Sequence, residues 1–227
     1  MDHRGDLDAQ RARWEAAFLK TRDMFGEAPS TPAIKAAGVL AQAGCANLLE
    51  LGPGQGRDTL FFACGGLRVT ALDYSQTGLD AIVAKAEGAH AASRVTPICH
   101  DVRQSLPFPG ESFDACYSHM LFCMALTTPE LERLSAEVRR VLRPGGINVY
   151  TVRHAQDAHY GTGIHRGEDL YEVGGFIVHF FSREKVVQLA EGWELLAVDE
   201  FEEGGLPRRL FRVTLRKPAS AIERATG

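Results

Sequence analysis

Short apolar segments alternate with helical patterns through the middle of this 227-residue chain. The segments "ANLLEL", "LRVTALD", "VTPICHD", "FDACYSH" and "INVYTVR" each have the character of a strand, and stretches with helical spacing, such as "SQTGLDAIVAKAEGA", lie between them. The strands are apolar nearly throughout, as strands covered on both faces must be. The alternation therefore predicts an α/β fold with a parallel sheet and helices on both of its faces.

The same patterns divide the chain into consecutive parts. Residues 1–45 contain two helical patterns, residues 46–152 contain the alternation, and residues 182–217 contain a helix followed by two strands. Between them, residues 153–181 form a Gly- and His-rich connection in which neither periodicity persists. The length suits one domain with a complete core, so we expect a single domain over residues 1–227.

Composition narrows the classes of function. The formal net charge of −4 gives no general attraction to nucleic acid or to an anionic membrane. We find no signal segment at the N-terminus and no apolar run of about 18 residues, so we expect a cytoplasmic protein with no membrane contact. The five cysteines have no CxxC pairing, which indicates reduced thiols. The expected partner is a small molecule rather than nucleic acid, and the expected assembly is a monomer or homodimer.

The segment "LLELGPGQGRDT" joins the first strand to the first crossover helix, at the edge of a parallel sheet where ligands bind. Gly52, Gly54 and Gly56 allow a tight turn and a close approach of the backbone to a ligand. A dinucleotide loop, GxGxxG, would have a glycine at position 57, where this chain has Arg57, and Glu50 would repel a pyrophosphate. The motif therefore argues against a nicotinamide dehydrogenase. The alternative to a ligand-binding loop is a plain tight turn between strand and helix.

Acidic residues follow the next two strands. Asp73 lies near the spacing at which an acid accepts hydrogen bonds from a ribose; it could also cap the next helix, a role for which Ser75 is available. Asp101 ends the third strand at the same edge of the sheet and could accept a hydrogen bond from an adenine amine. The three strand ends converge on a site sized for a nucleoside.

In order and spacing, "LLELGPGQGRDT", "VTALDYS", "CHDV", "FDACYSHMLFCM" and "VLRPGG" resemble the motifs of class I S-adenosylmethionine-dependent methyltransferases of the small-molecule type. The resemblance spans roughly residues 46–152. It implies a Rossmann-like fold with a seven-stranded, mostly parallel sheet whose last strand is antiparallel. It also implies S-adenosyl-L-methionine as the cofactor.

The resemblance assigns cofactor contacts to residues at the ends of the first four strands, which are Glu50, Gly52, Gly54, Gly56, Asp73, Tyr74, Asp101, Val102 and Tyr117. Glu50 and the glycine loop would hold the methionine end, Asp73 the ribose, and Asp101 with Val102 the adenine. Residues 117–119 would lie beside the sulfonium. An acid at position 50 also suits a cationic ligand on electrostatic grounds.

Residues 153–181 follow the fifth strand, where members of this family often build the acceptor pocket. We interpret this connection as a substrate lid. Candidates for a catalytic base or orienting group are His119, His159 and Tyr160, and candidates for binding the substrate are Arg153, His154 and Arg166. A polar surface loop is the alternative interpretation.

A metal site is not expected in this connection, because the intervals between its histidines fit neither helical ligation nor a known zinc spacing. In the N-terminal helices, Trp14, Phe18, Met24 and Phe25 are interpreted as core residues, with Phe25 and Gly26 as secondary candidates for the cofactor site.

The predicted function is transfer of a methyl group from S-adenosylmethionine to an oxygen, sulfur, carbon or metalloid atom of a small molecule, by in-line displacement. The sequence "YSHM" stands where amino-methylating members have an "NPPY"-type turn, which argues against exocyclic-amine chemistry. A non-catalytic, regulatory protein that binds S-adenosylmethionine is the alternative.

Overall fold

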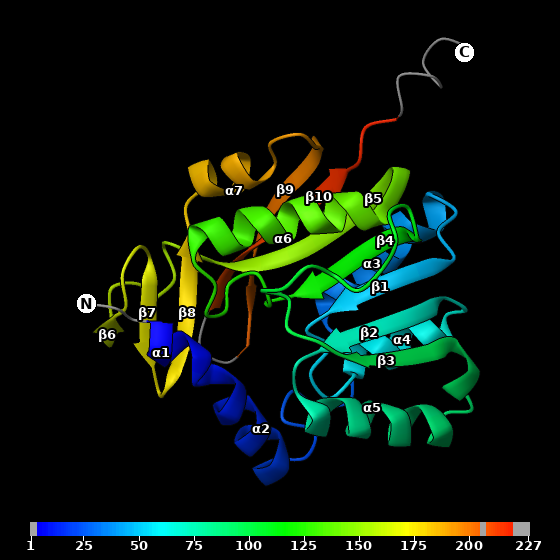
Figure 1. The fold of residues 1–227 in the computed structure, drawn as a ribbon, viewed down its shortest axis with the longest axis horizontal. Coiled ribbons are helices and arrows are strands. Elements are labelled where there is room, and N and C mark those ends of the chain that lie inside the picture. Colours follow the sequence, from blue (N-terminus) through cyan, green and yellow to red (C-terminus); the bar gives the residue numbers. More distant parts are fainter. Residues whose placement is uncertain (1–3, 205–207, 220–227) are drawn as a thin grey trace.

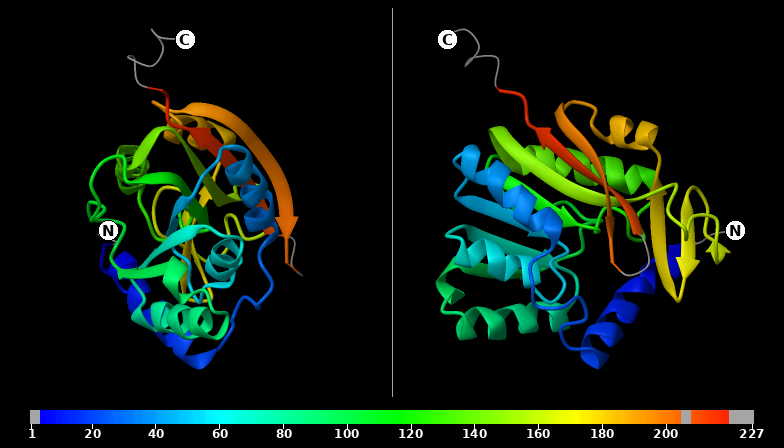
Figure 2. Two further views of the ribbon diagram at one scale, coloured as in Figure 1. Left: turned by 90° about the vertical axis from the view of Figure 1, so that its right-hand side faces the viewer. Right: turned by 180° about the vertical axis from the view of Figure 1, so that it is seen from behind.

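A computed structural model describes residues 4–204 and 208–219. Its centre is a twisted sheet with helices on both faces, so the predicted α/β fold class is confirmed (Figures 1 and 2). The main sheet has the order β3-β2-β1-β4-β5-β10-β9, in which the first five strands are parallel and β10 is antiparallel to both of its neighbours. The strand bounds are β1 (Asn47–Leu51), β2 (Arg68–Asp73), β3 (Val95–Cys99), β4 (Phe113–His119), β5 (Leu142–His154), β9 (Glu194–Glu203) and β10 (Arg208–Arg216).

The helices cover the two faces of the sheet in separate groups. Their bounds are α1 (Arg4–Asp8), α2 (Gln10–Lys20), α3 (Thr31–Gln42), α4 (Arg57–Cys64), α5 (Gln76–Gly88), α6 (Thr128–Val141) and α7 (Arg183–Leu189). Apolar residues of α6 and α7 pack on one face, and those of α3, α4 and α5 pack on the other. Helix α2 lies beside the ends of the strands, where it contacts the N-terminus of α5 (Figure 1).

The N-cap of α6 is Thr127, which has the extended backbone of such a residue, with ψ at 161°, and Thr128 begins the helix. The carboxylate of Glu130 accepts hydrogen bonds from the backbone N–H and the hydroxyl of Thr127, at 2.8 and 2.9 Å. This capping box satisfies donors that a helix start leaves without partners.

The connection after β5 contains three strands where the sequence suggested an irregular loop. They are β6 (Ile164–His165), β7 (Leu170–Val173) and β8 (Phe176–Phe181), and they form an antiparallel extension in which β8 pairs with the end of β5. Gly174 and Gly175 form the turn of the β7–β8 hairpin, with φ at 61° and 87°. A Gly-Gly pair between apolar runs is a signal for a two-residue hairpin, and it was available in the sequence.

Candidate functional site

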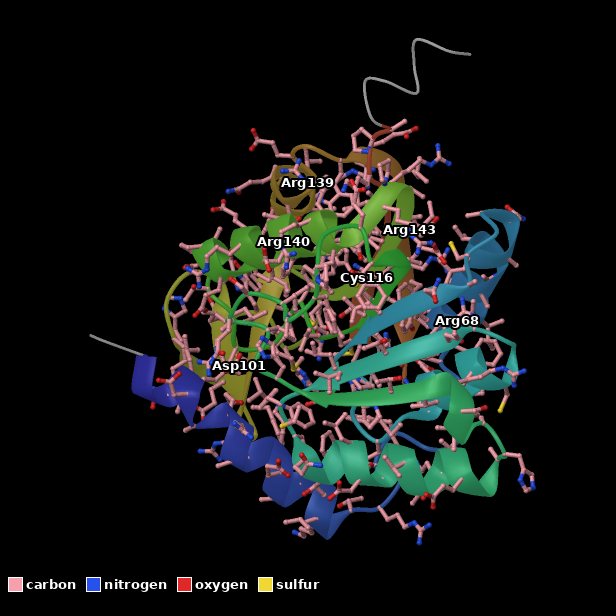
Figure 3. The ribbon with its side chains drawn as sticks, turned by 45° about the vertical axis from the view of Figure 1, so that its right-hand side comes forward. Arg68, Asp101, Cys116, Arg139, Arg140 and Arg143 are labelled. Carbon is pink, nitrogen blue, oxygen red and sulfur yellow. The ribbon has the colours of Figure 1, made fainter. Side chains whose placement is uncertain are left out.

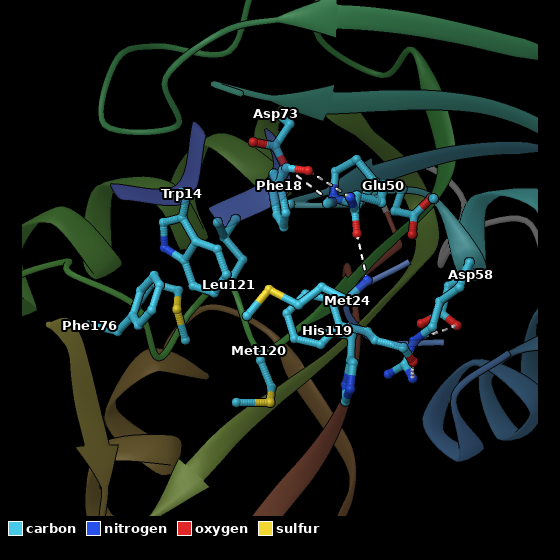
Figure 4. A pocket seen from close by; sticks show the side chains of 18 of the residues that line it. Trp14, Phe18, Met24, Glu50, Asp58, Asp73, His119, Met120, Leu121 and Phe176 are labelled. Atoms are coloured by element: carbon cyan, nitrogen blue, oxygen red, sulfur yellow. Dashed lines mark hydrogen bonds and ion pairs between the residues drawn. The ribbon is translucent and has the colours of Figure 1, made fainter. Parts of the chain in front are cut away.

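A cavity of about 320 Å³ lies at the carboxyl ends of β1, β2, β4 and β5. Its floor is the glycine loop, and its walls include aromatic and sulfur-containing side chains from α2, from the segment after it and from β8 (Figure 4). At its outer side are residues from the ends of β4, β5, β9 and β10. This is the edge at which an open parallel sheet binds its ligands.

The three glycines of the loop all have left-handed backbones, with φ of 68° at Gly52, 56° at Gly54 and 85° at Gly56. A Cβ on Gly52 would lie 2.9 Å from Cβ of Leu121, and one on Gly56 would lie 2.5 Å from Cγ1 of Ile82. Two of the glycines are therefore required by packing as well as by backbone conformation.

Arg57 is the first residue of α4, and its Nη1 donates a hydrogen bond to the carbonyl of Phe25 at 2.8 Å. This contact ties the glycine loop to the segment that follows α2. Gln55 reinforces the tie, because its amide donates to the carbonyl of Phe18 and accepts from the N–H of Met24. The arginine at position 57 thus joins two walls of the cavity.

Three carboxylates gather at the inner end of the cavity, and all are almost completely buried: Glu50, Asp58 and Asp73 (Figure 4). Burial raises the pKa of Glu50 to about 8, with a further increase from the charge of Asp58. Among the described residues, Oε2 of Glu50 has no hydrogen-bond partner. A cationic ligand fits this end of the cavity, because it would stabilise the charged form of a carboxylate that the protein leaves unpaired.

Asp73 is held in a fixed orientation at the end of β2. Its Oδ2 accepts from the N–H of Gly54 at 3.1 Å, and its Oδ1 accepts from the N–H of Ser75 at 2.9 Å. The expected division of roles is seen here, since the hydroxyl of Ser75 caps α5 by accepting from the N–H of Gly78. Burial raises the pKa of Asp73 to about 6. Its carboxylate remains on the cavity wall.

Asp101 and Val102 line a separate small cavity of about 40 Å³, which shares Tyr74, Leu121 and Met124 with the main one. Asp101 lies beside the N-terminal helices (Figure 3). Its carboxylate accepts from the guanidinium of Arg103, at 3.0 Å from Nε and 2.7 Å from Nη2, and these contacts lower its pKa despite partial burial.

His119 ends β4, and its ring contacts side chains of β5 and β9. Its Nδ1 lies 2.8 Å from Oγ1 of Thr151 on β5, and its Nε2 lies 3.1 Å from Oε2 of Glu203 on β9. The hydrogen bond from His119 lowers the pKa of Glu203, and the charges of Arg57 and Arg208 act in the same direction. All of these residues except Thr151 line the cavity.

Arg153 reaches the cavity from the end of β5, and His159 reaches it from the connection that follows. The guanidinium of Arg153 is buried and pairs with the carboxylate of Asp157, which also accepts from the N–H of His159 and of Arg209. Nη2 of Arg153 lies 3.2 Å from Nδ1 of His159. The four residues form one connected network.

The structure does not bring the remaining candidates to this cavity. The ring of Tyr117 is buried toward α3 and α4, where its hydroxyl contacts Asp58 and Ser30. Tyr117 lies two residues before the end of β4, whereas His119 is the last residue of the strand and reaches the cavity. His154 packs on Phe211, Tyr160 donates to Asp169, and Arg166 pairs with Asp6 and Glu172.

Several cavity residues were not expected from the sequence. Those from the N-terminal segment were interpreted as core, whereas the structure places them on the cavity wall: they are Trp14, Phe18 and Met24, together with the secondary candidates Phe25 and Gly26. Glu203 and Arg208 were also missed. They face each other across the β9–β10 pair, and the strand-pair pattern alone gave no reason to relate that end to the site.

Within residues 4–204 and 208–219, no group of three or more His, Cys, Asp and Glu side chains could hold a metal ion. No helix in the same part of the chain has both the length and the apolar character needed to span a membrane.

Residues 48–146 match the family model described as a methyltransferase domain. No curated protein sequence matches the chain. Solved structures with similar folds include a 1,6-didemethyltoxoflavin-N1-methyltransferase from Burkholderia thailandensis with bound 1,6-didemethyltoxoflavin and S-adenosylhomocysteine, which is 21% identical with a TM-score of 0.75 over 93% of this chain and 88% of that one. A second is a SAM-dependent methyltransferase from Methanosarcina mazei, 21% identical with a TM-score of 0.68 over 77% and 93% of the two chains.

A third similar structure is the [4+2]-cyclase SpnF, 19% identical with a TM-score of 0.64 over 82% of each chain. These likenesses agree with the strand order and with the glycine loop at the end of β1. S-adenosylmethionine, a cation at its sulfonium and ammonium groups, fits the acidic end of the cavity. The match of residues 48–146 to a methyltransferase domain, and the fold shared with S-adenosylmethionine-dependent methyltransferases, agree with a class I architecture.

Proposed function

We propose that this protein transfers the methyl group of S-adenosylmethionine to a small-molecule acceptor that binds in the same cavity. One observation supports this most directly: a single cavity extends from the acidic group at Glu50 and Asp73 to the polar group at His119, Arg153 and Glu203. A cofactor held at the acidic end would direct its reactive group toward the polar end.

The residues at the inner end suit the parts of the cofactor. Asp73 would accept hydrogen bonds from the ribose, while Glu50 and the loop from Gly52 to Gly56 would hold the methionine end. Asp101 and the backbone of Val102, beside the smaller cavity, would bind the adenine. When bound, the cofactor supplies an activated methyl group, so the work of the protein is positioning and the exclusion of water.

Helix α2 and the β7–β8 hairpin would act as the cover of the site. Trp14 of α2 and Phe176 of β8 are in ring contact at 4.4 Å, and Gln10 binds the hairpin backbone at Gly175 and Ile177. Together they enclose one side of the cavity, which supports an acceptor of small size and a reaction shielded from solvent. The structure of the Burkholderia enzyme contains 1,6-didemethyltoxoflavin, a small molecule.

A second candidate is a protein that binds S-adenosylmethionine without transferring its methyl group, for instance a regulatory protein. The likeness to a [4+2]-cyclase favours keeping this candidate, because it shows that the fold is not restricted to methyltransferases.

The test has two stages. Mass spectrometry of the protein as purified, and calorimetric titration with S-adenosylmethionine and S-adenosylhomocysteine, would establish cofactor binding. Formation of S-adenosylhomocysteine is then measured across a panel of oxygen, sulfur, carbon and metalloid acceptors. Cofactor binding with turnover supports methyl transfer, binding without turnover across the panel favours the second candidate, and absence of binding rejects both.

A further inference from the structure

The two ends of the cavity have opposite charge. The inner end contains the carboxylates of Glu50, Asp58 and Asp73, whereas Arg153 and Arg208 line the outer end. Arg57 lies between the two ends, 3.9 Å from Asp58 and 3.8 Å from Glu203. The negative charge of the inner end suits a cationic cofactor, and the positive charge of the outer end suits an anionic ligand.

The positive charge at the outer end is only partly balanced. Arg153 is paired with Asp157, and Glu203 lies 3.8 Å from Arg57. Arg208 has no carboxylate within ion-pair distance among the residues that the structure describes. Arg57 also lies 3.9 Å from Asp58, so Arg57 and Arg153 both have carboxylate partners, and Arg208 is the arginine of the three whose charge is not engaged in an ion pair within the described part of the chain.

His119 has no free basic nitrogen. The carboxylate of Glu203 can only accept, so Nε2 of His119 donates to it. Oγ1 of Thr151 accepts from the N–H of Met120 and has its own proton available for Nδ1 of the neutral ring. Both nitrogens are thus engaged in the arrangement that satisfies every donor.

The ring of His159 accepts a hydrogen bond at Nδ1, and it too offers no basic nitrogen to a ligand. Arg153 has only donors, so Nδ1 of His159 must accept from its Nη2. A neutral ring whose Nδ1 accepts has its proton on Nε2, and it can therefore offer a ligand a donor but not a base. Glu203, the remaining acceptor at this end, is surrounded by His119, Arg57 and Arg208, which weaken its ability to take up a proton.

We propose that the acceptor binds as an anion, with a carboxylate, phenolate or thiolate group beside Arg208, and that it is methylated without losing a proton to the protein. This inference rests on the proposed function. The anionic atom donates an electron pair to the methyl carbon as the bond from that carbon to sulfur breaks, and the pair of that bond stays on sulfur. One negative and one positive charge disappear, and no proton has to move.

The walls around this end indicate the rest of the acceptor. Met120, Met124, Val178 and Phe176 provide an apolar surface in the same cavity as the arginines. A flat or aliphatic body would pack there while its anionic group reaches the guanidinium of Arg208. Neutralisation of charge is also favoured in a site of low dielectric, since the reactants lose more solvation there than the products do.

Ligand-observed NMR on the protein saturated with S-adenosylhomocysteine tests the inference without a known substrate. The probes are matched pairs: aromatic carboxylates with their amides, and 4-nitrophenolate with 4-nitroanisole. We expect the anions to bind and their neutral partners to bind at least about tenfold more weakly, as the loss of a charge-assisted hydrogen bond implies.

Three variants sharpen the test. Arg208→Gln should weaken anion binding about tenfold, and Glu203→Gln should strengthen it by removing a nearby negative charge. Arg212→Gln is the matched control, because Arg212 lies on the same strand but pairs with Asp199 at 2.7 Å, and it should leave binding unchanged. The affinity for S-adenosylhomocysteine should be the same in all three.

Equal binding of anions and neutral partners, the absence of any bound anion, or indifference to Arg208→Gln would overturn the inference while leaving the proposed function in place. Failure of the parent protein to bind S-adenosylhomocysteine would instead count against the proposed function itself.

Discussion

Glu15 of helix α2 lies at the N-terminus of helix α5, where its Oε1 accepts a hydrogen bond from the backbone N–H of Gln76 at 2.7 Å. Its Oε2 accepts from the next amide, that of Thr77, at 3.2 Å. A carboxylate at this position stabilises α5 through its unpaired amides and its dipole. The same contact fixes α2 to the cofactor side of the cavity.

Replacement of Glu15 by alanine should loosen α2. We expect a loss of about 1 kcal/mol in the free energy of unfolding, as for other lost caps, and faster hydrogen exchange in residues 10–20. Exchange mass spectrometry in the presence of S-adenosylhomocysteine measures this. Glu27→Ala, at an exposed position near the same segment, is the control. Equal exchange in both variants would mean that α2 is held by its apolar contacts alone.

Asp73→Ala should weaken cofactor binding. The variant removes the proposed ribose acceptor and leaves the amides of Gly54 and Ser75 without a partner, so we expect a loss of about 1.5–3 kcal/mol in binding free energy. Calorimetric titration with S-adenosylmethionine is the measurement. Unchanged affinity would show that the ribose binds elsewhere.

A pair of glycine variants separates backbone strain from packing. Gly56 and Gly26 both have positive φ, at 85° and 78°, but a Cβ on Gly56 would lie 2.5 Å from Ile82 whereas one on Gly26 would have open space. Gly26→Ala should cost only the strain of the left-handed conformation, on the order of 1 kcal/mol in the free energy of unfolding. Gly56→Ala adds the steric clash, so it should lower the melting temperature clearly more. Similar melting temperatures would indicate that α5 shifts to accommodate the methyl group.

The stability of the ligand-free protein should fall as the pH rises through the neutral range. Glu50 has its pKa raised from 4.5 to about 8, mainly by burial, so the folded protein holds a proton that the unfolded chain has released between those values. The free energy of unfolding then decreases with pH across this window, by up to about 1.4 kcal/mol per unit. Asp73, raised to about 6, adds to the effect at lower pH.

Glu50→Gln should remove most of this dependence. Urea unfolding at about pH 5 should give similar stabilities for the variant and the parent, and at about pH 8.5 the variant should be the more stable. A stability difference that does not change with pH would show that Glu50 is already ionised in the ligand-free protein.

The sequence was sufficient for the elements whose pattern is local. The apolar runs of β1, β2 and β4 and the glycine loop between β1 and α4 have periodicity and turn chemistry that a single window reveals. Glu50 and Asp73 could be proposed because a parallel sheet brings the ends of its strands to one edge.

The rest of the site depends on contacts between distant segments. Trp14 lies in α2 and Phe25 follows that helix, and nothing in the local sequence distinguishes an apolar residue of a cavity wall from one of the core. Glu203 reaches His119 across 84 positions of sequence, through two strands that lie between them in the sheet. Such a pairing depends on the order of the strands in the sheet, and the periodicity of apolar residues does not predict that order.

The register of the last two strands places Glu203 directly opposite Arg208, at the rim of the cavity. Neither residue belongs to the glycine loop or to the strand ends that would hold the nucleoside. Substitutions at this rim could therefore change which acceptors are accepted while the cofactor site stays intact. Such an arrangement lets specificity diversify during evolution at little risk to the reaction, and it makes the β9–β10 hairpin the natural target for redesign of acceptor preference.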